Sequence, residues 1–555
     1  MEQKRLLVAI ALSFLVFLLW SVFFAPKKPD IPAEQAQETS ASGTPQEKPT
    51  PAAEKQEAVE KRTTGELTTL KDAQPSRSAR SVSVDTPLYR ITVSEEGAAV
   101  ISMVLKAYRE TIDADSPNKE LIPKEVAGGT VLSSFDGAGG AALEKAVFTA
   151  DIAADSITVQ GEPTDLRFTF VTADGVRIEK SYRFFPDSYL IDLNITVHNE
   201  SDQAIQGAFK VGLRDRAELE AGAYGFQGPS GLINGGLEQV KIKKIAEQNK
   251  FEGKIRWVAI EGQYFMGSLI SKTPIEGTML LAYKDKNLEN QLVTELGAIA
   301  PGTSQALAYS LFMGPKSLSV LKAANNDLDR AIDFGWVEFI AKPCLYFMNF
   351  IYRYIPNYGI AIIILTIITR LIFWPLAQKS YKSMNDMRKL QPLMQEIRDK
   401  YKDDKARVNQ ETMALYRTYK INPMGGCLPM LIQMPVFFAL YRMLYQAIEL
   451  RHAPFFGWVN DLSAPDRLFH FAFKIPFMDE PYGIPVLTII MGATMLLQQK
   501  LSPQAGDPMQ AKMMMMMPIV FTFIFINFPS GLVLYWLVSN LVSIAQQYYT
   551  QKKLA

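Results

Sequence analysis

Residues 358–377 read YGIAIIILTIITRLIFWPLA. The run is long and apolar enough to cross a lipid bilayer as a helix. It contains one charge, Arg370, and a guanidinium inside a membrane costs roughly 3 kcal/mol even on lenient insertion scales. Because an ionisable residue at that depth is functional by default, we take Arg370 as the centre of a candidate site.

Bulk composition excludes several classes of protein. The 555 residues are too many for one core and predict two or three folding units. The 58 basic and 57 acidic residues balance, so no overall field points to a nucleic acid substrate. Two cysteines, Cys344 and Cys427, and three histidines build neither a disulfide framework nor a zinc site.

The N-terminal 80 residues predict a membrane anchor followed by a tether. Residues 6–25 form an uninterrupted apolar run after Lys4 and Arg5, without a small-x-small cleavage pattern. We therefore predict a retained signal-anchor helix over residues 1–25, with a cleaved signal peptide as the alternative. Residues 26–80 are rich in Pro, Ala, Glu and Lys and predict a disordered linker.

Between residues 81 and 316 the apolar residues recur with a period of two. LRFTF at 166–170, VRIEKSYRF at 176–184 and YLIDLNITV at 189–197 are typical of half-buried strands separated by turns. The pattern predicts a large antiparallel β-sandwich. The glycine-rich segment 222–236 lacks the GKS or GKT of a phosphate-binding loop, so we expect a surface loop there.

Residues 317–357 change to a helical pattern and connect the β-domain to the membrane region. The second half, IAKPCLYFMNFIYRYIPN, is rich in aromatic residues and has two charges, Lys342 and Arg353. We predict a helical connector that ends in an amphipathic helix at the membrane interface. A buried helix of the β-domain is the alternative.

Residues 378–420 hold eleven basic and six acidic residues. Short segments rich in Lys and Arg stay in the cytoplasm, so the β-domain lies outside and both termini lie inside. Helical spacing of apolar residues predicts a cytoplasmic helical hairpin over residues 379–420. A docking or gating arm and a plain solvated loop are equally open interpretations of its charge.

Four further apolar segments follow, at 422–448, 483–499, 513–528 and 532–549. With residues 358–377 they predict five spans within 358–551, and six in the whole chain. We therefore expect a multi-span α-helical membrane protein with six transmembrane helices, five of them forming a core.

No Asp or Glu falls within the last five predicted spans, so Arg370 has no counter-ion at membrane depth. Either it snorkels to the cytoplasmic surface or it faces water in a pocket open to the cytoplasm. Polar residues on the spans favour the pocket. They are Thr366, one turn before Arg370, and Gln433, Gln498, Thr522, Ser539, Asn540 and Ser543.

Several motifs then carry a resemblance. They are TRLIFWPL (369–376), QPLMQEIRDKYKDDK (391–405), NPMGGCLPMLIQMPVFFALY (422–441), WVNDLSAPD (458–466) and FPSGLVLYWLVSN (528–540). Together they resemble the YidC/Oxa/Alb family of membrane protein insertases. The match covers the five-span core with its hairpin, and the anchor and tethered β-domain are similar in layout to the Gram-negative form.

The resemblance implies a protein of the bacterial inner membrane, with a periplasmic β-domain, that inserts and helps fold other membrane proteins. It implies that the protein works alone or beside the Sec translocon. It also implies that the protein needs no ATP hydrolysis, cofactor, metal or catalytic residue. The implied partners are nascent membrane proteins and the lipid bilayer, with the hairpin and the C-terminus as candidate contacts for the ribosome and the signal-recognition machinery.

The resemblance also implies two functional surfaces. The first is an inward-open hydrophilic groove that receives the polar part of a client, and the second is a hydrophobic slide along which the client's apolar segment leaves. We assign to the groove Arg370, Thr366, Gln433, Gln498, Tyr535 and Trp536. We assign to the slide Cys427, Met430, Met434, Phe437, Met517 and Phe521. Methionine, with its flexible side chain, suits a surface that accepts varied apolar clients, and ordinary packing within the membrane core is the equally open alternative.

Two other function classes compete with this interpretation. A small-molecule or ion transporter predicts inverted repeats, and the spans show no such symmetry. A membrane-anchored carbohydrate enzyme needs a pair of carboxylates in a cleft of the β-domain. Deletion of residues 82–314 distinguishes these, because an insertase keeps most activity and an enzyme loses all of it.

Overall fold

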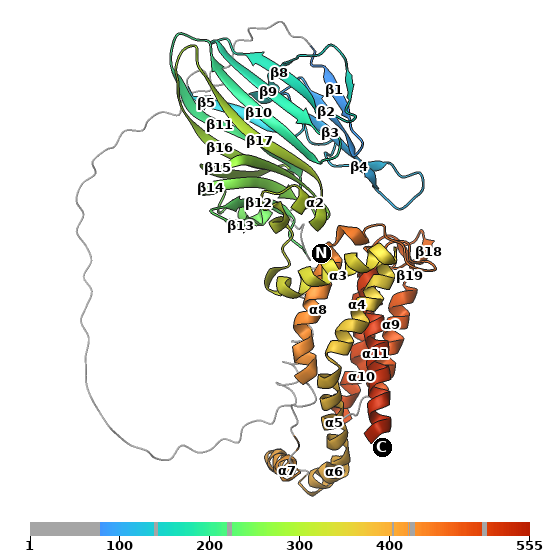
Figure 1. The fold of residues 1–555 in the computed structure, drawn as a ribbon. Coiled ribbons are helices and arrows are strands. Elements are labelled where there is room, and N and C mark those ends of the chain that lie inside the picture. Colours follow the sequence, from blue (N-terminus) through green and yellow to red (C-terminus); the bar gives the residue numbers. More distant parts are fainter. Residues whose placement is uncertain are drawn as a thin grey trace, which may run out of the picture. The chain divides into compact units, whose positions relative to one another are not determined.

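The computed structural model describes residues 78–137, 143–218, 225–401, 404–419, 421, 428–501 and 508–554. A β-rich part comes first in the chain, drawn blue to green, and a helical part follows, drawn yellow to red (Figure 1). The predicted signal-anchor, residues 1–25, and the predicted linker up to residue 77 lie outside the described residues.

The β-rich part contains two sheets among the described residues. The smaller has five strands in the order β4-β3-β2-β1-β7, and the larger has twelve. The smaller sheet consists of β1 (Ser81–Asp85), β2 (Tyr89–Ser94), β3 (Val100–Arg109), β4 (Asn118–Glu120) and β7 (Ser156–Thr158). The larger consists of β5 (Leu132–Gly137), β6 (Thr149–Ala150), β8 (Thr164–Val171), β9 (Val176–Phe184), β10 (Leu190–Asn199), β11 (Ile205–Arg216), β12 (Gly228–Ile233), β13 (Gly236–Gln239), β14 (Lys250–Glu261), β15 (Phe265–Lys284), β16 (Asn287–Ile299) and β17 (Ser304–Pro315).

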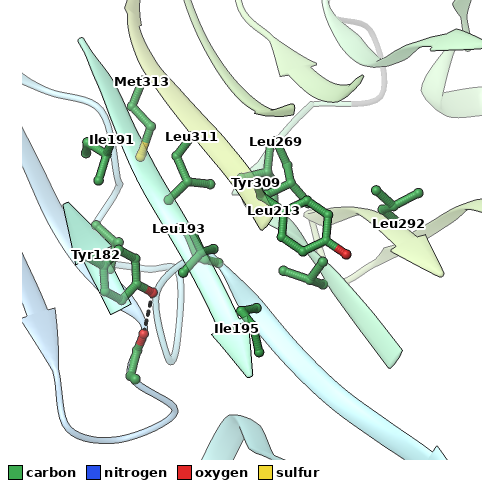
Figure 2. Packing of buried hydrophobic residues seen from close by; sticks show 14 of the residues in the cluster. Tyr182, Ile191, Leu193, Ile195, Leu213, Leu269, Leu292, Tyr309, Leu311 and Met313 are labelled. Carbon is green, nitrogen blue, oxygen red and sulfur yellow. Dashed lines mark hydrogen bonds between the residues drawn. The ribbon is translucent and has the colours of Figure 1, made fainter. Parts of the chain in front are cut away.

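Period-two burial builds the core of this domain. Alternate residues of β9 and β10 are buried, as the sequence pattern predicts. Figure 2 shows their apolar side chains packed with those of other strands of the larger sheet. The hydroxyl of Tyr182 donates a hydrogen bond of 2.7 Å to the carbonyl of Ala98, beyond the end of β2 (Figure 2). The β-rich character of the predicted β-sandwich is confirmed, whereas the sandwich arrangement itself stays a prediction.

Two local predictions for this domain hold only in part. Strands β1 and β7 pair in parallel, so the pairing is not purely antiparallel. The chain passes through five other strands between them, and no hairpin fixes their relative direction. The glycine-rich segment is not all surface loop, because every residue of β12 is buried. A Cβ on Gly231 would meet the sulfur of Met279 at 2.8 Å, so glycine permits the close packing there.

Lys180 on β9 is fully buried within this core. Its Nζ donates to the carbonyl of Gly97 at 2.7 Å and lies 5.6 Å from the ring centre of Phe148. Desolvation by burial lowers the pKa of Lys180 to about 7, against a smaller opposing effect of Glu144. Lys180 therefore links the larger sheet to the turn after β2 by a hydrogen bond, but its burial destabilises the charged form of its amine.

A pH dependence of stability follows from Lys180. Between about pH 7 and the ordinary lysine pKa of about 10.4, the unfolded chain binds more protons than the folded chain, so the free energy of unfolding rises with pH. The rise from this group is at most roughly 1.4 kcal/mol per pH unit. We expect urea unfolding of the β-domain in the full chain, followed by hydrogen exchange of β9, to show greater stability at pH 9 than at pH 7. Lys180→Met should abolish this rise, and an unchanged slope would contradict the assignment.

The helical part follows β17. Its helices are α2 (Leu318–Ala323), α3 (Glu338–Tyr354), α4 (Tyr358–Ile372), α5 (Trp374–Lys389), α6 (Gln391–Lys400), α7 (Lys405–Thr418), α8 (Leu428–Gln446), α9 (Val486–Leu501), α10 (Pro508–Phe525) and α11 (Ser530–Leu554). A two-stranded hairpin, β18 (Leu468–Phe471) and β19 (Tyr482–Ile484), precedes α9. Helix α3 is amphipathic: Leu345 and Met348 are buried, whereas Phe350 and Tyr354 are exposed.

The apolar run 358–377 is not one straight helix. Asn357 caps α4 by accepting a hydrogen bond of 3.1 Å from the amide of Ile360. The helix ends at Ile372, and α5 starts at Trp374 after a bend of 61°. Pro375 lies in the first turn of α5, where its missing amide hydrogen is tolerated, but it cannot continue α4 without losing a hydrogen bond.

Within the described residues, no helix taken alone has both the length and the apolar character needed to cross a membrane. The bent pair α4 and α5 meets that measure jointly, and α9 and residues 514–525 are shorter apolar helices. The count of six spans therefore stays a prediction.

Helices α6 and α7 follow α5 and pack against each other. The hydroxyl of Tyr416 contacts the sulfur of Met394 at 3.4 Å between them. Asp404 caps α7 by accepting from the amide of Arg407 at 2.9 Å. The first residues of the predicted hairpin, 379–389, belong to α5.

Candidate functional site

Arg370 lies in the last turn of α4, and its partly buried side chain joins three helices. Its Nε donates to the hydroxyl of Ser539 on α11 at 2.8 Å, and its Nη1 donates to the amide oxygen of Gln433 on α8 at 3.0 Å. Nη2 also contacts the hydroxyl of Ser539. The guanidinium therefore points into the helix bundle.

The described groups that hydrogen-bond to Arg370 are neutral. In the part of the chain that the structure describes, no carboxylate forms an ion pair with it, and its acceptors are a hydroxyl and an amide. A guanidinium has five N–H donors, of which these contacts use three. Two donors are thus left without an acceptor among the described residues, and a carboxylate is the group that a guanidinium binds best.

Two tyrosines complete the surroundings of the guanidinium. Tyr535 lies one turn before Ser539 on α11 and is buried, and Tyr381 lies on α5. Both interact electrostatically with Arg370. Sequence reasoning assigned Tyr535 and missed Tyr381. Tyr381 lies beyond the bend of 61° between α4 and α5, so its distance along the chain from Arg370 gave no signal.

Two other residues assigned to the groove, Thr366 and Gln498, form no hydrogen bond to Arg370 among the described residues. Thr366 is fully buried, and its hydroxyl donates to the carbonyl of Ile362 in its own helix at 2.6 Å. Gln498 is partly buried on α9. Gln433 and Ser539 thus hydrogen-bond directly to Arg370. The hydroxyl of Thr366 instead donates to a backbone carbonyl of its own helix.

Trp536 packs on the side of the assigned slide. Its ring lies 4.9 Å from that of Phe437 on α8, and 4.7 Å and 6.3 Å from those of Phe525 and Phe521 on α10. Neighbouring residues of α11 thus have different environments: Tyr535 interacts electrostatically with Arg370, and the ring of Trp536 packs between α8 and α10.

The remaining slide residues divide in two. The side chains of Met434 on α8 and Met517 on α10 are exposed. Cys427 and the side chain of Met430 lie outside the described part of the chain.

A buried polar stripe on α11 extends the site beyond Arg370. Gln546 donates from Nε2 to the carbonyl of Trp374 at 2.9 Å, and Asn540 donates from Nδ2 to Thr494 on α9 at 3.3 Å. The stripe consists of Ser539, Asn540, Ser543, Gln546, Gln547 and Thr550, all buried. Its second half was missed, although its spacing of three or four residues marks one helix face.

Among the described residues, no group of three or more His, Cys, Asp or Glu side chains lies close enough together to hold a metal ion. The candidate site thus consists of one cation, neutral polar groups and adjoining apolar faces.

Comparisons with known proteins cover the whole chain. A family model described as 60Kd inner membrane protein matches residues 350–555, and one described as YidC periplasmic domain matches residues 81–347. The membrane protein insertase YidC of Syntrophus aciditrophicus (strain SB) is 40% identical over 561 residues, which cover 99% of this chain and 100% of the relative. That of Syntrophobacter fumaroxidans (strain DSM 10017 / MPOB) is 39% identical over 561 residues, covering 99% and 100%.

One solved structure is also similar. The crystal structure of an active YidC insertase, with its first transmembrane domain resolved, is 19% identical with a TM-score of 0.38. The match covers 85% of this chain and 93% of that chain.

Proposed function

Because this chain belongs to the YidC family of membrane protein insertases, which places it in the inner membrane with a periplasmic β-rich domain, we propose that it receives nascent membrane proteins at Arg370. The observation that carries the proposal is a partly buried guanidinium held by neutral groups, Ser539 and Gln433. Clients of this kind carry a polar or acidic tail next to an apolar segment.

The electrostatic step at Arg370 needs no covalent chemistry. Bringing a carboxylate into the membrane alone is costly, and a cation already fixed in place offsets part of that cost. The interaction is stronger there than in bulk water, because fewer solvent dipoles screen it. The N–H groups left over on the guanidinium donate hydrogen bonds to the client's carboxylate, while the hydroxyl and amide partners hold the guanidinium in position.

The apolar segment of the client then leaves along α8 and α10. Met434 and Met517 are exposed on these helices, and the rings of Phe437 and Phe521 flank Trp536 beside them. Methionine side chains adapt to different apolar partners, which suits a surface serving many clients. Transfer of the segment into lipid supplies the driving force, so ATP hydrolysis is not required.

The topology proposed for this mechanism has six spans, with both termini in the cytoplasm. The eleven basic residues between 378 and 420 support a cytoplasmic position for α6 and α7. This basic helix pair is a candidate contact for the ribosome and the signal-recognition machinery. The protein works alone or beside the Sec translocon, and it also acts as a chaperone that helps clients fold. The groove around Arg370 opens toward the same side, so a client meets the hairpin first.

Photocrosslinking of a stalled nascent membrane protein tests the function. We place a photoreactive amino acid at Met434 or Met517, which are exposed on α8 and α10, and at Val171, which is exposed on β8 of the β-domain, as the control. We expect client crosslinks from the two helical positions and none from the control. Crosslinks confined to Val171 would overturn the proposal.

A further inference from the structure

Three phenylalanines are exposed on the segment between α8 and α9. Phe469, Phe473 and Phe477 are 68%, 65% and 79% exposed, respectively. Phe469 lies on β18, and the other two lie on the ten residues that join β18 to β19. Several exposed apolar side chains on one short segment mark an interaction surface, because each ring offers a large apolar area to bury.

The start of this segment is held firmly by Asp466, which is buried. Its Oδ2 accepts from the amide of Leu487 at 2.7 Å, and its Oδ1 accepts from the hydroxyl of Thr488 at 2.9 Å. Asp466 thus caps the first turn of α9, where a negative charge also interacts favourably with the helix dipole. The segment and α9 form one unit.

Arg467 and Asn527 hold the rest of the segment against the end of α10. Arg467 donates to the carbonyl of Ile526 at 2.8 Å and to that of Pro481 at 2.9 Å. Asn527 accepts from the amide of Asp479 at 2.9 Å and donates to the carbonyl of Phe477 at 3.0 Å. The three phenylalanines are therefore displayed by a fixed platform.

The backbone conformation of two of these phenylalanines is also unusual. Phe469 and Phe477 have φ values of 55° and 64°, in the left-handed region. A bulky residue seldom adopts this conformation, which costs on the order of 1–3 kcal/mol. Both strained residues are among the three exposed phenylalanines of the segment.

The apolar surface of α9 and α10 continues onto the platform. Phe523 on α10 is exposed one turn before Asn527, whose side chain holds the carbonyl of Phe477. On α9, Ile489 and Ile490 are exposed just after the helix begins at Val486. In a membrane protein such outward apolar faces contact lipid. The segment that continues them is then expected to contact the interface of the same lipid leaflet.

We propose that residues 468–484 form a lipid-binding wedge. The rings of Phe469, Phe473 and Phe477 insert at the boundary between headgroups and acyl chains, in the leaflet next to the start of α9. Exposed Lys474, between two of the rings, lies at headgroup level and favours anionic lipids. The wedge rests on the proposed placement of α9 and α10 in the membrane, and does not depend on Arg370.

Spin labels in the full-length protein test the wedge. Labels are placed at Phe473→Cys and Phe477→Cys, after Cys344→Ser and Cys427→Ser, in vesicles of phosphatidylethanolamine and phosphatidylglycerol. Collisions with oxygen, which concentrates in lipid, are compared with collisions with a water-soluble nickel chelate. Phe523→Cys, exposed on α10, serves as the lipid control, and Glu247→Cys, exposed in the β-domain, as the water control.

We expect the ratio of oxygen to nickel collisions at positions 473 and 477 to shift toward that at 523. A ratio equal to that at 247 would overturn the wedge. Shielding from both reagents would also overturn it, because the rings would then pack on a protein partner or a second copy of the chain. Water access at 523 as well would show that the placement of α10 is wrong. Client insertion, assayed separately, reports on the proposed function alone.

Discussion

Replacing Arg370 by alanine is expected to slow the insertion of clients with an acidic translocated tail by roughly 10-fold or more, and to leave clients with a neutral tail much less affected. The reason is the loss of a charge-assisted hydrogen bond to the client, worth roughly 1.5–3 kcal/mol. About 1.4 kcal/mol corresponds to a factor of ten. The measurement is protease protection of inserted client in proteoliposomes.

Two matched pairs sharpen this experiment. The clients differ only in Asp or Asn within the tail, so their apolar segments are identical. The variants are Arg370→Lys, which keeps the charge, and Arg370→Gln, which keeps only hydrogen bonding. Lysine cannot reach both Ser539 and Gln433 as the planar fork of arginine does, so we expect an intermediate rate for acidic clients. Equal loss for Asp and Asn clients would refute an electrostatic role.

The second large effect concerns the stability of the β-domain, where Lys316 and Glu261 form a buried ion pair. The nitrogen of Lys316 lies 2.7 Å from Oε2 of Glu261, and the two side chains are 6% and 0% exposed. Lys316→Met leaves an uncompensated buried carboxylate, and we expect a loss of about 3–5 kcal/mol in the free energy of unfolding. Lys316 directly follows β17 and Glu261 ends β14, so the pair holds the chain where it leaves the sheet.

A rescue variant and a surface control accompany this prediction. Because the double variant Lys316→Met with Glu261→Leu removes both charges, it should regain most of the lost stability. Lys272→Met breaks a similar contact of 2.8 Å to Asp192, but the side chains there are 42% and 22% exposed. That change should cost less than about 1 kcal/mol. Urea unfolding of the full chain in detergent measures all three, and equal losses at Lys316 and Lys272 would contradict the argument.

Local patterns were sufficient to predict the strands. The alternating stretches at 166–170, 176–184 and 189–197 correspond to β8, β9 and β10. Period two is a property of neighbouring residues, so it can be read along the chain. The parallel pair β1 and β7 and the buried strand β12 were missed, because both depend on what the rest of the sheet places beside them.

The helical part shows the same division. Composition indicated an apolar run, but Pro375 and the bend at Phe373 divide it between α4 and α5. Polar residues of α11 as far as Ser543 were predicted to face inward, whereas Gln546, Gln547 and Thr550 lie closer to the charged C-terminus, where composition resembles a solvated end.

For Arg370, the sequence by itself determined that a cation stands in an apolar run with no acidic residue in the predicted spans. This is a count along the chain, and it needs no fold. Only the tertiary structure decided that Gln433 and Ser539 hold the guanidinium, that Thr366 bonds its own helix, and that Trp536 faces the other way. Gln433 and Ser539 lie 63 and 169 positions from Arg370, and contacts over such separations depend on how whole helices pack.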